Sequence, residues 1–197
     1  MTRGECITPI EVLGVLEFEN TAIGYFALDA AVKAAPVDVL NVSTINPGKL
    51  LIFLSGDVAS VESSIHSGAL AAGESLVESL VLPWVHEEVV AAVMPQGRVS
   101  AKYRGESVAV FDASTITSGI EAADRAVKET GISIDMIRFD DAMGGRVSVR
   151  FSGDLHDLEV ALETVRELLE PASRLVRQVI IANPHPDMMN KVAGYET

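Results

Sequence analysis

The sequence predicts an α+β fold made of two consecutive ferredoxin-like domains, each with the element order β-α-β-β-α-β. Three observations lead to this prediction. Short stretches of the first half return in the second half at a nearly constant distance. Apolar residues form strand-like runs, separated by segments with helical spacing. Each half of the 197-residue chain also has the length of a small domain.

The repeat is visible in two pairs of segments. Segment 29–33 recurs as 124–128, with Asp first and Lys last in both copies, a shift of 95 residues. The tripeptide Ser-Gly-Asp at 55–57 recurs at 152–154, a shift of 97 residues. A period near half the chain length indicates two domains rather than a solenoid. We expect the first domain at residues 10–95 and the second at 106–190, with a polar, glycine-containing linker between them.

The first strand and the first helix can be assigned in both copies. Apolar runs at 13–19 and 108–112 predict the first strand. Tyr25, Leu28 and Val32 then share one face through i, i+3, i+7 spacing, and the second copy carries the same stripe. Lys33 and its counterpart Lys128 fall near the ends of these helices, where positive charge suits the helix dipole.

Two strands joined by a turn follow the first helix. In the first copy they are expected at 37–43 and 50–54, joined by a loop at 44–49 that contains Pro-Gly. The second copy has the longer loop 140–146, which contains Gly-Gly. The strand at 50–54 is apolar throughout, which predicts that both of its faces are covered. Its counterpart 147–151 alternates apolar and polar residues, which predicts one face in water.

The second helix and the last strand complete each copy. Ser-Gly-Asp precedes an apolar stripe of helical spacing in both halves. The last strands are expected at 76–82 and 175–182. Segments 84–94 and 183–197 are expected to be short tails.

Composition excludes several function classes. A net charge of −13 without a basic stripe argues against nucleic-acid binding and against anionic membrane surfaces. No apolar run reaches the roughly 20 residues of a membrane span. The single Cys6 allows no disulfide within the chain, so we expect a cytoplasmic protein. Apolar residues make up 48% of the sequence, and we expect the excess to lie in subunit interfaces.

The sequence offers no catalytic or metal constellation. Glu17, Glu19 and Asp112 resemble acid–base candidates only superficially, because no nucleophile, base and orienting group occur together. Nucleotide-binding glycine motifs are missing. The four histidines lack the spacing of zinc sites. We therefore expect no enzyme activity, no catalytic residue, no metal and no cofactor.

The two copies resemble the shell domains of bacterial microcompartments (BMC domains). The resemblance rests on the Asp-x-x-x-Lys helix, on the glycine-containing loop before the third strand, and on the Gly-Asp helix start at 56–57 and 153–154. Pro184-His185 after the last strand adds to it. The resemblance extends over nearly the whole chain, twice.

Two such domains in one chain resemble the tandem-domain shell proteins that form trimers. The resemblance implies a homotrimer, shaped as a pseudohexameric tile, that joins other shell proteins edge to edge around encapsulated enzymes. It implies a central pore for small metabolites, lined by the loops before the third strands. The implied pore residues are Asn46, Pro47, Gly48, Met143, Gly144 and Gly145. It also implies a location in the microcompartment shell.

The pore loop departs from one subgroup of the family. The propanediol-utilisation type has Cys-Pro-Gly-Lys in this loop and holds an iron–sulfur cluster there. This chain has Asn46 in place of that cysteine, and an amide is not a ligand of such clusters. We therefore expect a pore without metal, in which Asn46 offers polar contacts.

The resemblance also implies residues at the tile edge. Lys33 and Lys128 match the edge lysine of the family, and Asn183 and His185 lie at the matching corner. The family often has Arg where this chain has Asn183. Without the resemblance, the lysines can also be interpreted as solvated residues at helix ends, and the loops as ordinary turns. A tandem ferredoxin-like regulatory protein that senses a small molecule is the alternative function, because fold alone does not decide function.

Overall fold

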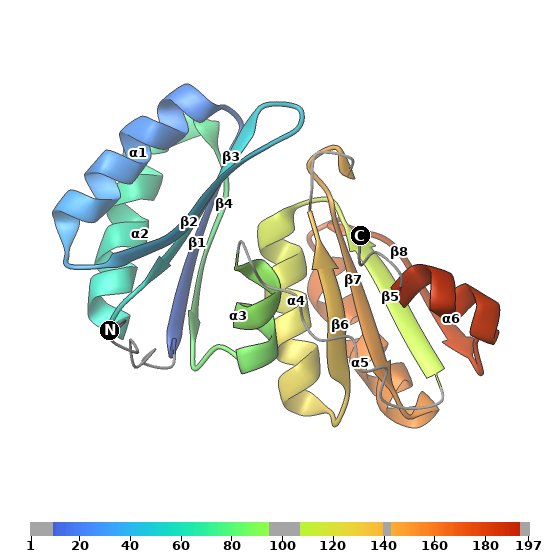
Figure 1. Cartoon of the computed structure of the whole chain (residues 1–197). Helices are drawn as coiled ribbons and strands as arrows, with labels where there is room; N and C mark the ends of the chain where they lie inside the picture. Colours follow the sequence, from blue (N-terminus) through green and yellow to red (C-terminus); the bar gives the residue numbers. More distant parts are fainter. Residues whose placement is uncertain (1–9, 95–106, 140–142, 194–197) are drawn as a thin grey trace, which may run out of the picture.

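The computed structural model describes residues 10–94, 107–139 and 143–193 and contains two domains that follow one another along the chain (Figure 1). The elements of the first domain are β1 (Val12–Phe18), α1 (Thr21–Ala34), β2 (Asp38–Ile45), β3 (Lys49–Ser55), α2 (Val58–Ala72), the short 3₁₀ helix η1 (Gly73–Ser75), β4 (Leu76–Pro83) and α3 (Glu87–Val93). Those of the second domain are β5 (Ser107–Ala113), α4 (Ile116–Glu129), β6 (Ser133–Arg138), β7 (Val147–Gly153), α5 (Leu155–Leu169), β8 (Leu175–Ala182) and α6 (Pro186–Ala193).

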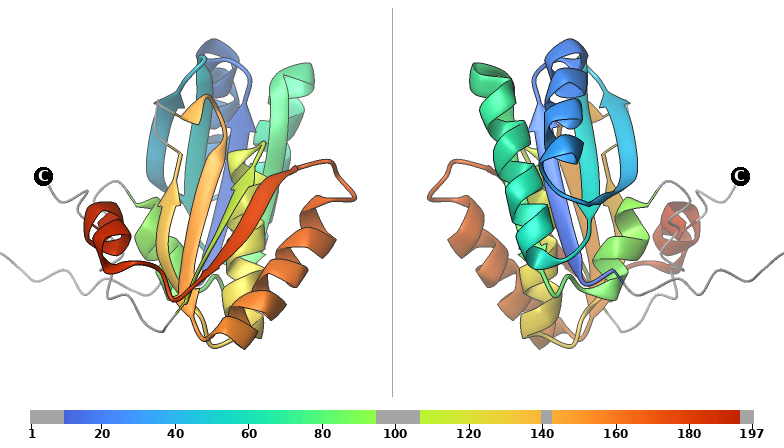
Figure 2. Two further views of the ribbon diagram at one scale, coloured as in Figure 1. Left: turned by 90° about the vertical axis from the view of Figure 1, so that its right-hand side faces the viewer. Right: turned by 90° about the vertical axis from the view of Figure 1, so that its left-hand side faces the viewer.

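Each domain has one four-stranded antiparallel sheet. The strand order is β2-β3-β1-β4 in the first domain and β6-β7-β5-β8 in the second. Figure 2 shows α1 and α2 side by side on one face of the first sheet. This arrangement confirms the predicted β-α-β-β-α-β unit in both copies.

Side-chain caps mark the beginnings of α1 and α2. The amide of Ile23 donates to Asn20 Oδ1 at 3.0 Å at the start of α1. The amide of Ser60 donates to Asp57 Oδ1 at 3.0 Å, so the predicted Ser-Gly-Asp start of α2 ends on an N-cap aspartate. The Ser60 contacts also lower the pKa of Asp57.

One glycine in each copy lets the first helix lie close to its sheet. A Cβ on Gly24 would lie 2.6 Å from Leu50 Cδ2, and a Cβ on Gly119 would lie 2.2 Å from Val147 Cγ1. Both distances are too short for any side chain. The repeated glycine therefore sets the spacing between helix and sheet.

The segments expected to be tails each contain a helix instead. Acidic side chains begin α3, where Glu87 and Glu88 suit the positive helix end, and Val89 and Val93 are buried. In the second copy α6 takes the corresponding place. A seven-residue helix shows barely two turns of apolar spacing, which is why the sequence pattern did not reveal α3.

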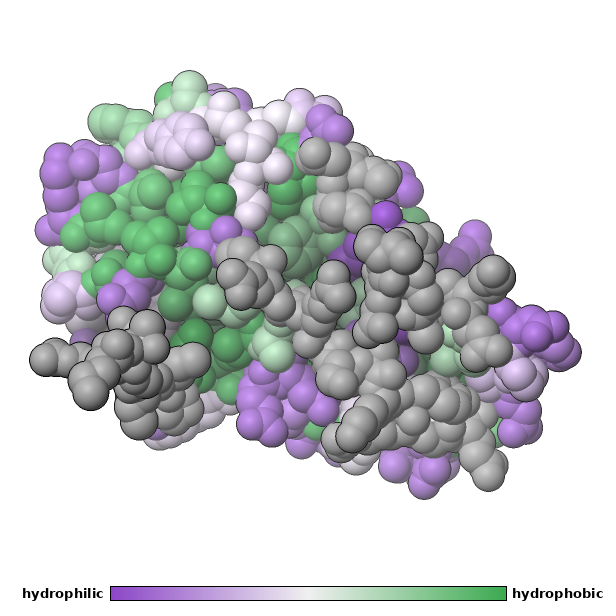
Figure 3. Space-filling view, in the orientation of Figure 1, coloured by the Kyte–Doolittle hydropathy of each residue, from purple (hydrophilic) through white to green (hydrophobic). Residues whose placement is uncertain are grey.

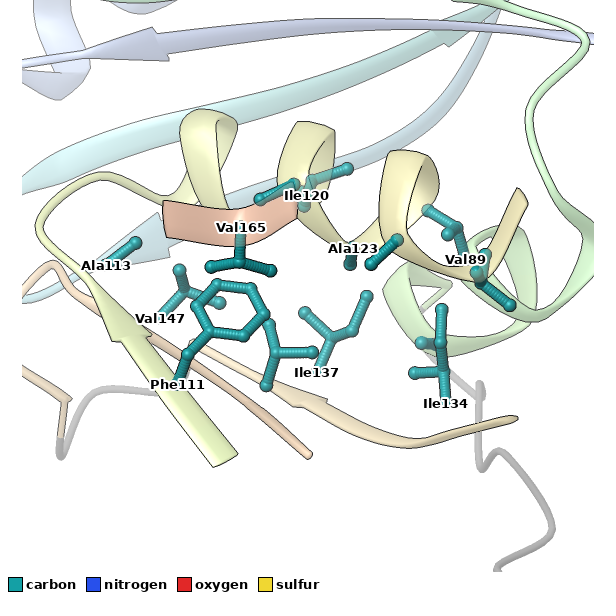
Figure 4. Close-up of a cluster of buried hydrophobic side chains, with 14 of the residues drawn as sticks. Val89, Phe111, Ala113, Ile120, Ala123, Ile134, Ile137, Val147 and Val165 are labelled. Atoms are coloured by element: carbon teal, nitrogen blue, oxygen red, sulfur yellow. The ribbon is translucent and has the colours of Figure 1, made fainter. Parts of the chain in front are cut away.

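The structure has two hydrophobic clusters, and one of them extends through both domains. Helices α1 and α2 and the near face of the first sheet form a cluster of their own. The other face of that sheet joins a second cluster, which continues through α3 and α4 into the interior of the second domain. Figure 4 shows this cluster, with Phe111 and Val147 of the second sheet pointing toward Ile120 and Ala123 of α4. Strand β3 is thus covered on both faces, as predicted.

The prediction of a wet face on β7 is wrong. Arg150 and Ser152 on that face are buried. Asp135 accepts hydrogen bonds from Ser152 Oγ at 2.7 Å and from Arg150 Nε at 3.3 Å, so polar groups pair with one another there. Burial raises the pKa of Asp135, although Ser152 and Arg150 act in the opposite direction.

Three features named from the sequence lie outside the described residues: Cys6, the linker 95–106 and residues 140–142 of the second loop. Within the described part, every helix is too short or too polar to cross a bilayer.

Candidate functional site: two hairpin turns and the interdomain seam

The first of the two loops is a tight turn at the tip of the β2–β3 hairpin. The amide of Gly48 donates to the carbonyl of Ile45 at 2.9 Å, and Gly48 has a φ of 117°, which favours glycine. Asn46 and Pro47 are exposed at this tip and are joined by a cis peptide bond. The described tip thus presents one amide side chain, one proline ring and open backbone.

The second loop ends in a similar turn at the tip of the β6–β7 hairpin. The amide of Arg146 donates to the carbonyl of Met143 at 3.2 Å. Gly144 and Gly145 have φ values of 61° and 77°, so both lie in the left-handed region. Met143 is half-buried and Gly144 is exposed.

The two turns lie against each other, although they are almost a hundred residues apart. Lys49 Nζ donates to the carbonyl of Gly145 at 3.4 Å. A Cβ on Gly145 would lie 3.3 Å from the carbonyl oxygen of Asn46, so glycine is needed for this approach. All six residues expected in the pore from the sequence therefore gather at one end of the molecule, where the hairpin tips meet (Figure 1).

A buried carboxylate of the first domain anchors this contact. Glu17 of β1 is fully buried, and its Oε1 accepts from Lys49 Nζ at 2.7 Å. Its Oε2 accepts from the amides of Ile116 and Thr117 at 2.9 and 3.1 Å and from the Thr117 hydroxyl. Glu17 thus caps α4 from outside the domain of that helix, where a negative charge suits the helix dipole.

A second carboxylate beside Glu17 completes the cap. Glu78 lies directly opposite Glu17 on the neighbouring strand β4. It accepts from the hydroxyls of Thr115 and Ser118 at 2.6 and 2.7 Å and from the Ser118 amide at 3.2 Å. Partial burial raises the pKa of Glu121, one turn further along α4, and the nearby charge of Glu78 adds to this shift.

Sequence reasoning did not find these cap residues. In the sequence Glu17 resembles only an acid–base candidate, because its hydrogen-bond partners on α4 lie 99 and 100 residues away. One local signal exists. Leu13, Val15 and Glu17 are two residues apart and share one face of β1, so a carboxylate ends an otherwise apolar row. An apolar row that ends in a carboxylate indicates a buried partner for that charge.

The predicted edge lysines lie at the opposite end of each domain from the hairpin turns. Lys33 Nζ contacts Asp29 at 2.6 Å in a pair whose side chains are 71% and 56% exposed. Lys128 makes the equivalent contact to Asp124 at 2.5 Å, but there the exposures are 35% and 5%. The difference arises because the first domain covers Asp124, which also accepts from the amide of His86 at 2.8 Å.

Asn183 and His185 follow β8 at the same end. Asn183 has a φ of 48° and is exposed, as is His185, whose Nδ1 accepts from the amide of Asp187 at 3.2 Å. The first copy repeats this geometry at Trp84, with a φ of 55°, and at His86, whose Nδ1 accepts from the Glu88 amide. The structure therefore groups Asn183 and His185 by local geometry but brings neither into contact with Lys128 in any interaction among the described residues.

Across residues 10–94, 107–139 and 143–193, acidic, histidine and cysteine side chains form no group of three that could hold a metal ion. The contacts described at the site are turn hydrogen bonds, helix caps and ion pairs.

Comparisons with known proteins cover nearly the whole chain. The family model described as "BMC domain" matches twice, at residues 12–85 and 107–184. The chain is 33% identical over 182 residues to the bacterial microcompartment shell protein PduT of Citrobacter freundii, which covers 92% of this chain and 97% of that protein. A shorter match, 35% identical over 63 residues, is to the bacterial microcompartment shell protein EutK of Salmonella typhimurium and covers 32% of this chain and 38% of that protein.

Solved structures agree with these matches. The crystal structure of a microcompartment protein from Desulfitobacterium hafniense superposes with a TM-score of 0.78 at 31% identity, covering 92% of this chain and 99% of the other. A fused permuted hexameric shell protein from the RMM microcompartment gives a TM-score of 0.61 at 18% identity, covering 82% and 85%. The second similarity shows the fold alone.

Proposed function

The chain belongs to the family of BMC-domain shell proteins of bacterial microcompartments, and from this premise we propose that three copies close into a ring-shaped tile around a central pore. The family confirms the prediction of a tandem-domain, structural protein rather than an enzyme. The observation that carries the proposal is the contact between the two hairpin turns, Lys49 to Gly145, at one end of the seam.

The seam between the domains supports a ring. It joins the sheet of one domain to the helix α4 of the next, so its two sides are different surfaces. Contacts of this heterologous kind generate rings when the rotation closes. With two domains in each chain, a ring of six domains needs only three chains.

The turns supply the pore. Asn46, Pro47 and Gly48 from the first domain and Met143, Gly144 and Gly145 from the second lie at the same end of the molecule. In a ring of three chains, six turns surround the axis. Their exposed groups are small or polar, which suits the passage of small metabolites.

The opposite end supplies the tile edge, where other shell proteins bind. Tiles joined in this way form the shell around encapsulated enzymes. Lys33, Lys128, Asn183 and His185 lie on this side of their domains. In the single chain Lys33 belongs to an exposed ion pair and Lys128 to a partly buried one, because the first domain covers only the second pair.

Sheet formation tests the edge assignment. Lys33→Ala and Lys128→Ala are expected to leave single tiles intact and to reduce extended sheets, with the larger loss in the double variant, because each removes a cation from an edge. The measurement is negative-stain electron microscopy at equal protein concentration. Arg166→Ala on α5 is the control, since Arg166 is a surface cation that contacts Glu163 away from the edge. Unchanged sheets in the double variant would exclude the lysines from the edge.

A further inference from the structure

Helices α1 and α4 occupy the same place in the two copies but differ in exposure. Tyr25 and Phe26 of α1 are 55% and 61% exposed, and Ile23 and Val32 are also exposed. Their counterparts on α4, 95 residues later, are Ile120, Glu121, Ser118 and Val127, and all but the half-buried Glu121 are buried. Figure 3 shows apolar side chains over the first domain on the side of α1 and β2.

The structure itself contains the surface that fits such a helix. Strands β1 and β4 of the first domain cover α4, with Glu17 and Glu78 directly opposite each other at its beginning. In the second domain the same cross-strand position holds Asp112 and Arg177, and the pair before it, Val110 and Val179, corresponds to Val15 and Leu80. Val179 and Arg177 are exposed.

Unmatched polar groups fall in complementary places. Within the described residues, the amides of Thr21 and Ala22 at the start of α1 have no acceptor, whereas the matching amides of Ile116 and Thr117 both donate to Glu17. The carboxylate of Asp112 has no donor among the described residues. In the described part of the chain, the start of α1 thus has free hydrogen-bond donors, and Asp112 provides a free acceptor. Asp112 lies at the position of the second sheet that corresponds to Glu17, the residue that caps α4.

We propose that the exposed face of α1 is the docking site for the β5–β8 face of a second copy, with Asp112 capping α1 and Arg177 lying over Phe26. This proposal rests on the proposed ring and assigns its contacts between chains. The assignment follows from the internal seam, where Asp112 takes the place of Glu17 and Arg177 that of Glu78. Glu78 contacts Ser118 of α4, whose counterpart on α1 is Ile23. Phe26 lies one turn further along the same face of α1, within reach of the long Arg177 side chain.

The seam between chains therefore differs in chemistry from the seam within the chain. The internal seam satisfies Glu78 with two hydroxyls. On α1, Ile23 stands where α4 has the hydroxyl of Ser118. Between chains, the Arg177 guanidinium over the Phe26 ring takes the place of the hydrogen bonds of Glu78. The amide of His185 can likewise reach Asp29, as the amide of His86 reaches Asp124. Substitutions at 177 or 26 are expected to open the seam between chains and to leave the internal seam closed.

Sedimentation velocity of the full chain tests this assignment. The unsubstituted protein is expected at the mass of three chains. Arg177→Glu and Phe26→Ala are each expected to weaken assembly by about tenfold or more, because each affects every seam of the ring. Asp112→Asn is expected to weaken it less. Phe26 is 61% exposed and Arg177 is exposed, so circular dichroism is expected to remain unchanged.

Two surface variants away from both seams serve as controls. Arg166→Glu on α5 matches the charge reversal, and Leu70→Ala on α2 matches the loss of an exposed apolar side chain. Both are expected to assemble as the unsubstituted protein does. Assembly of Arg177→Glu and Phe26→Ala at the unsubstituted affinity would overturn the seam assignment while leaving the ring intact. A single-chain mass for the unsubstituted protein would overturn the ring itself.

Discussion

At the scale of single residues, the contact between the domains depends on carboxylates that cap a helix from outside its own domain. Glu17 has no exposed surface, and all its described partners except Lys49 belong to α4. A buried charge of this kind is tolerated only when it is paired and hydrogen-bonded. Glu17 therefore links the sequence of one strand to the orientation of the neighbouring domain.

Removal of this carboxylate is expected to be costly. Glu17→Ala leaves two amides without an acceptor and Lys49 without the carboxylate of its ion pair, so the free energy of unfolding should fall by about 3–5 kcal/mol. Urea denaturation followed by circular dichroism measures this change. Glu19→Ala is the matched control, because Glu19 is exposed two residues away. An equal, small effect of both substitutions would show that Glu17 does not hold the seam.

The same residue shows why parts of the site could not be predicted from the sequence. The turns at 46–48 and 143–145 are local features of composition, and their positions on hairpin tips followed from Pro-Gly and Gly-Gly. The partners of Glu17 are set by the docking of one domain on the other, which no local pattern encodes. The pore role that we propose for the turns rests on the family resemblance rather than on their chemistry.

At the scale of elements, the repeated glycine controls how closely α1 and α4 approach their sheets. The spacing of apolar residues predicted strands and helices because each element buries one face, and the same spacing occurs in both copies. It failed for α3, which is too short to show a period, and for the polar face of β7, where Asp135, Arg150 and Ser152 pair with one another.

Packing at Gly119 gives a prediction at this scale. Gly119→Ala is expected to lower the free energy of unfolding by about 1–3 kcal/mol, because its Cβ would collide with Val147. Val147→Ala in the same chain should recover part of the loss, since it removes the colliding methyl groups. Gly56→Ala is the control, because its nearest neighbours are 3.5 Å away. Additive losses in the double variant, measured by urea denaturation, would contradict this collision.

At the scale of the whole molecule, two copies of one domain have acquired different surroundings. Helix α4 of the second domain packs against β1 and β4 of the first domain and is buried there. The equivalent surfaces, on α1 and on β5 and β8, are exposed in the single chain. The high apolar content of the sequence agrees with this arrangement, because some apolar side chains are exposed in the single chain, on the surfaces where we propose that a second chain docks. Duplication thus explains both the predicted fold and the unmatched surfaces.

Electron microscopy of the purified full chain, with class averaging, tests the central claim most directly. The account predicts flat particles in which three chains place six lobes around a central hole, with the hairpin turns facing the hole. Compact particles without three-fold symmetry would contradict the tile, and with it the pore assigned to Asn46 and its neighbours.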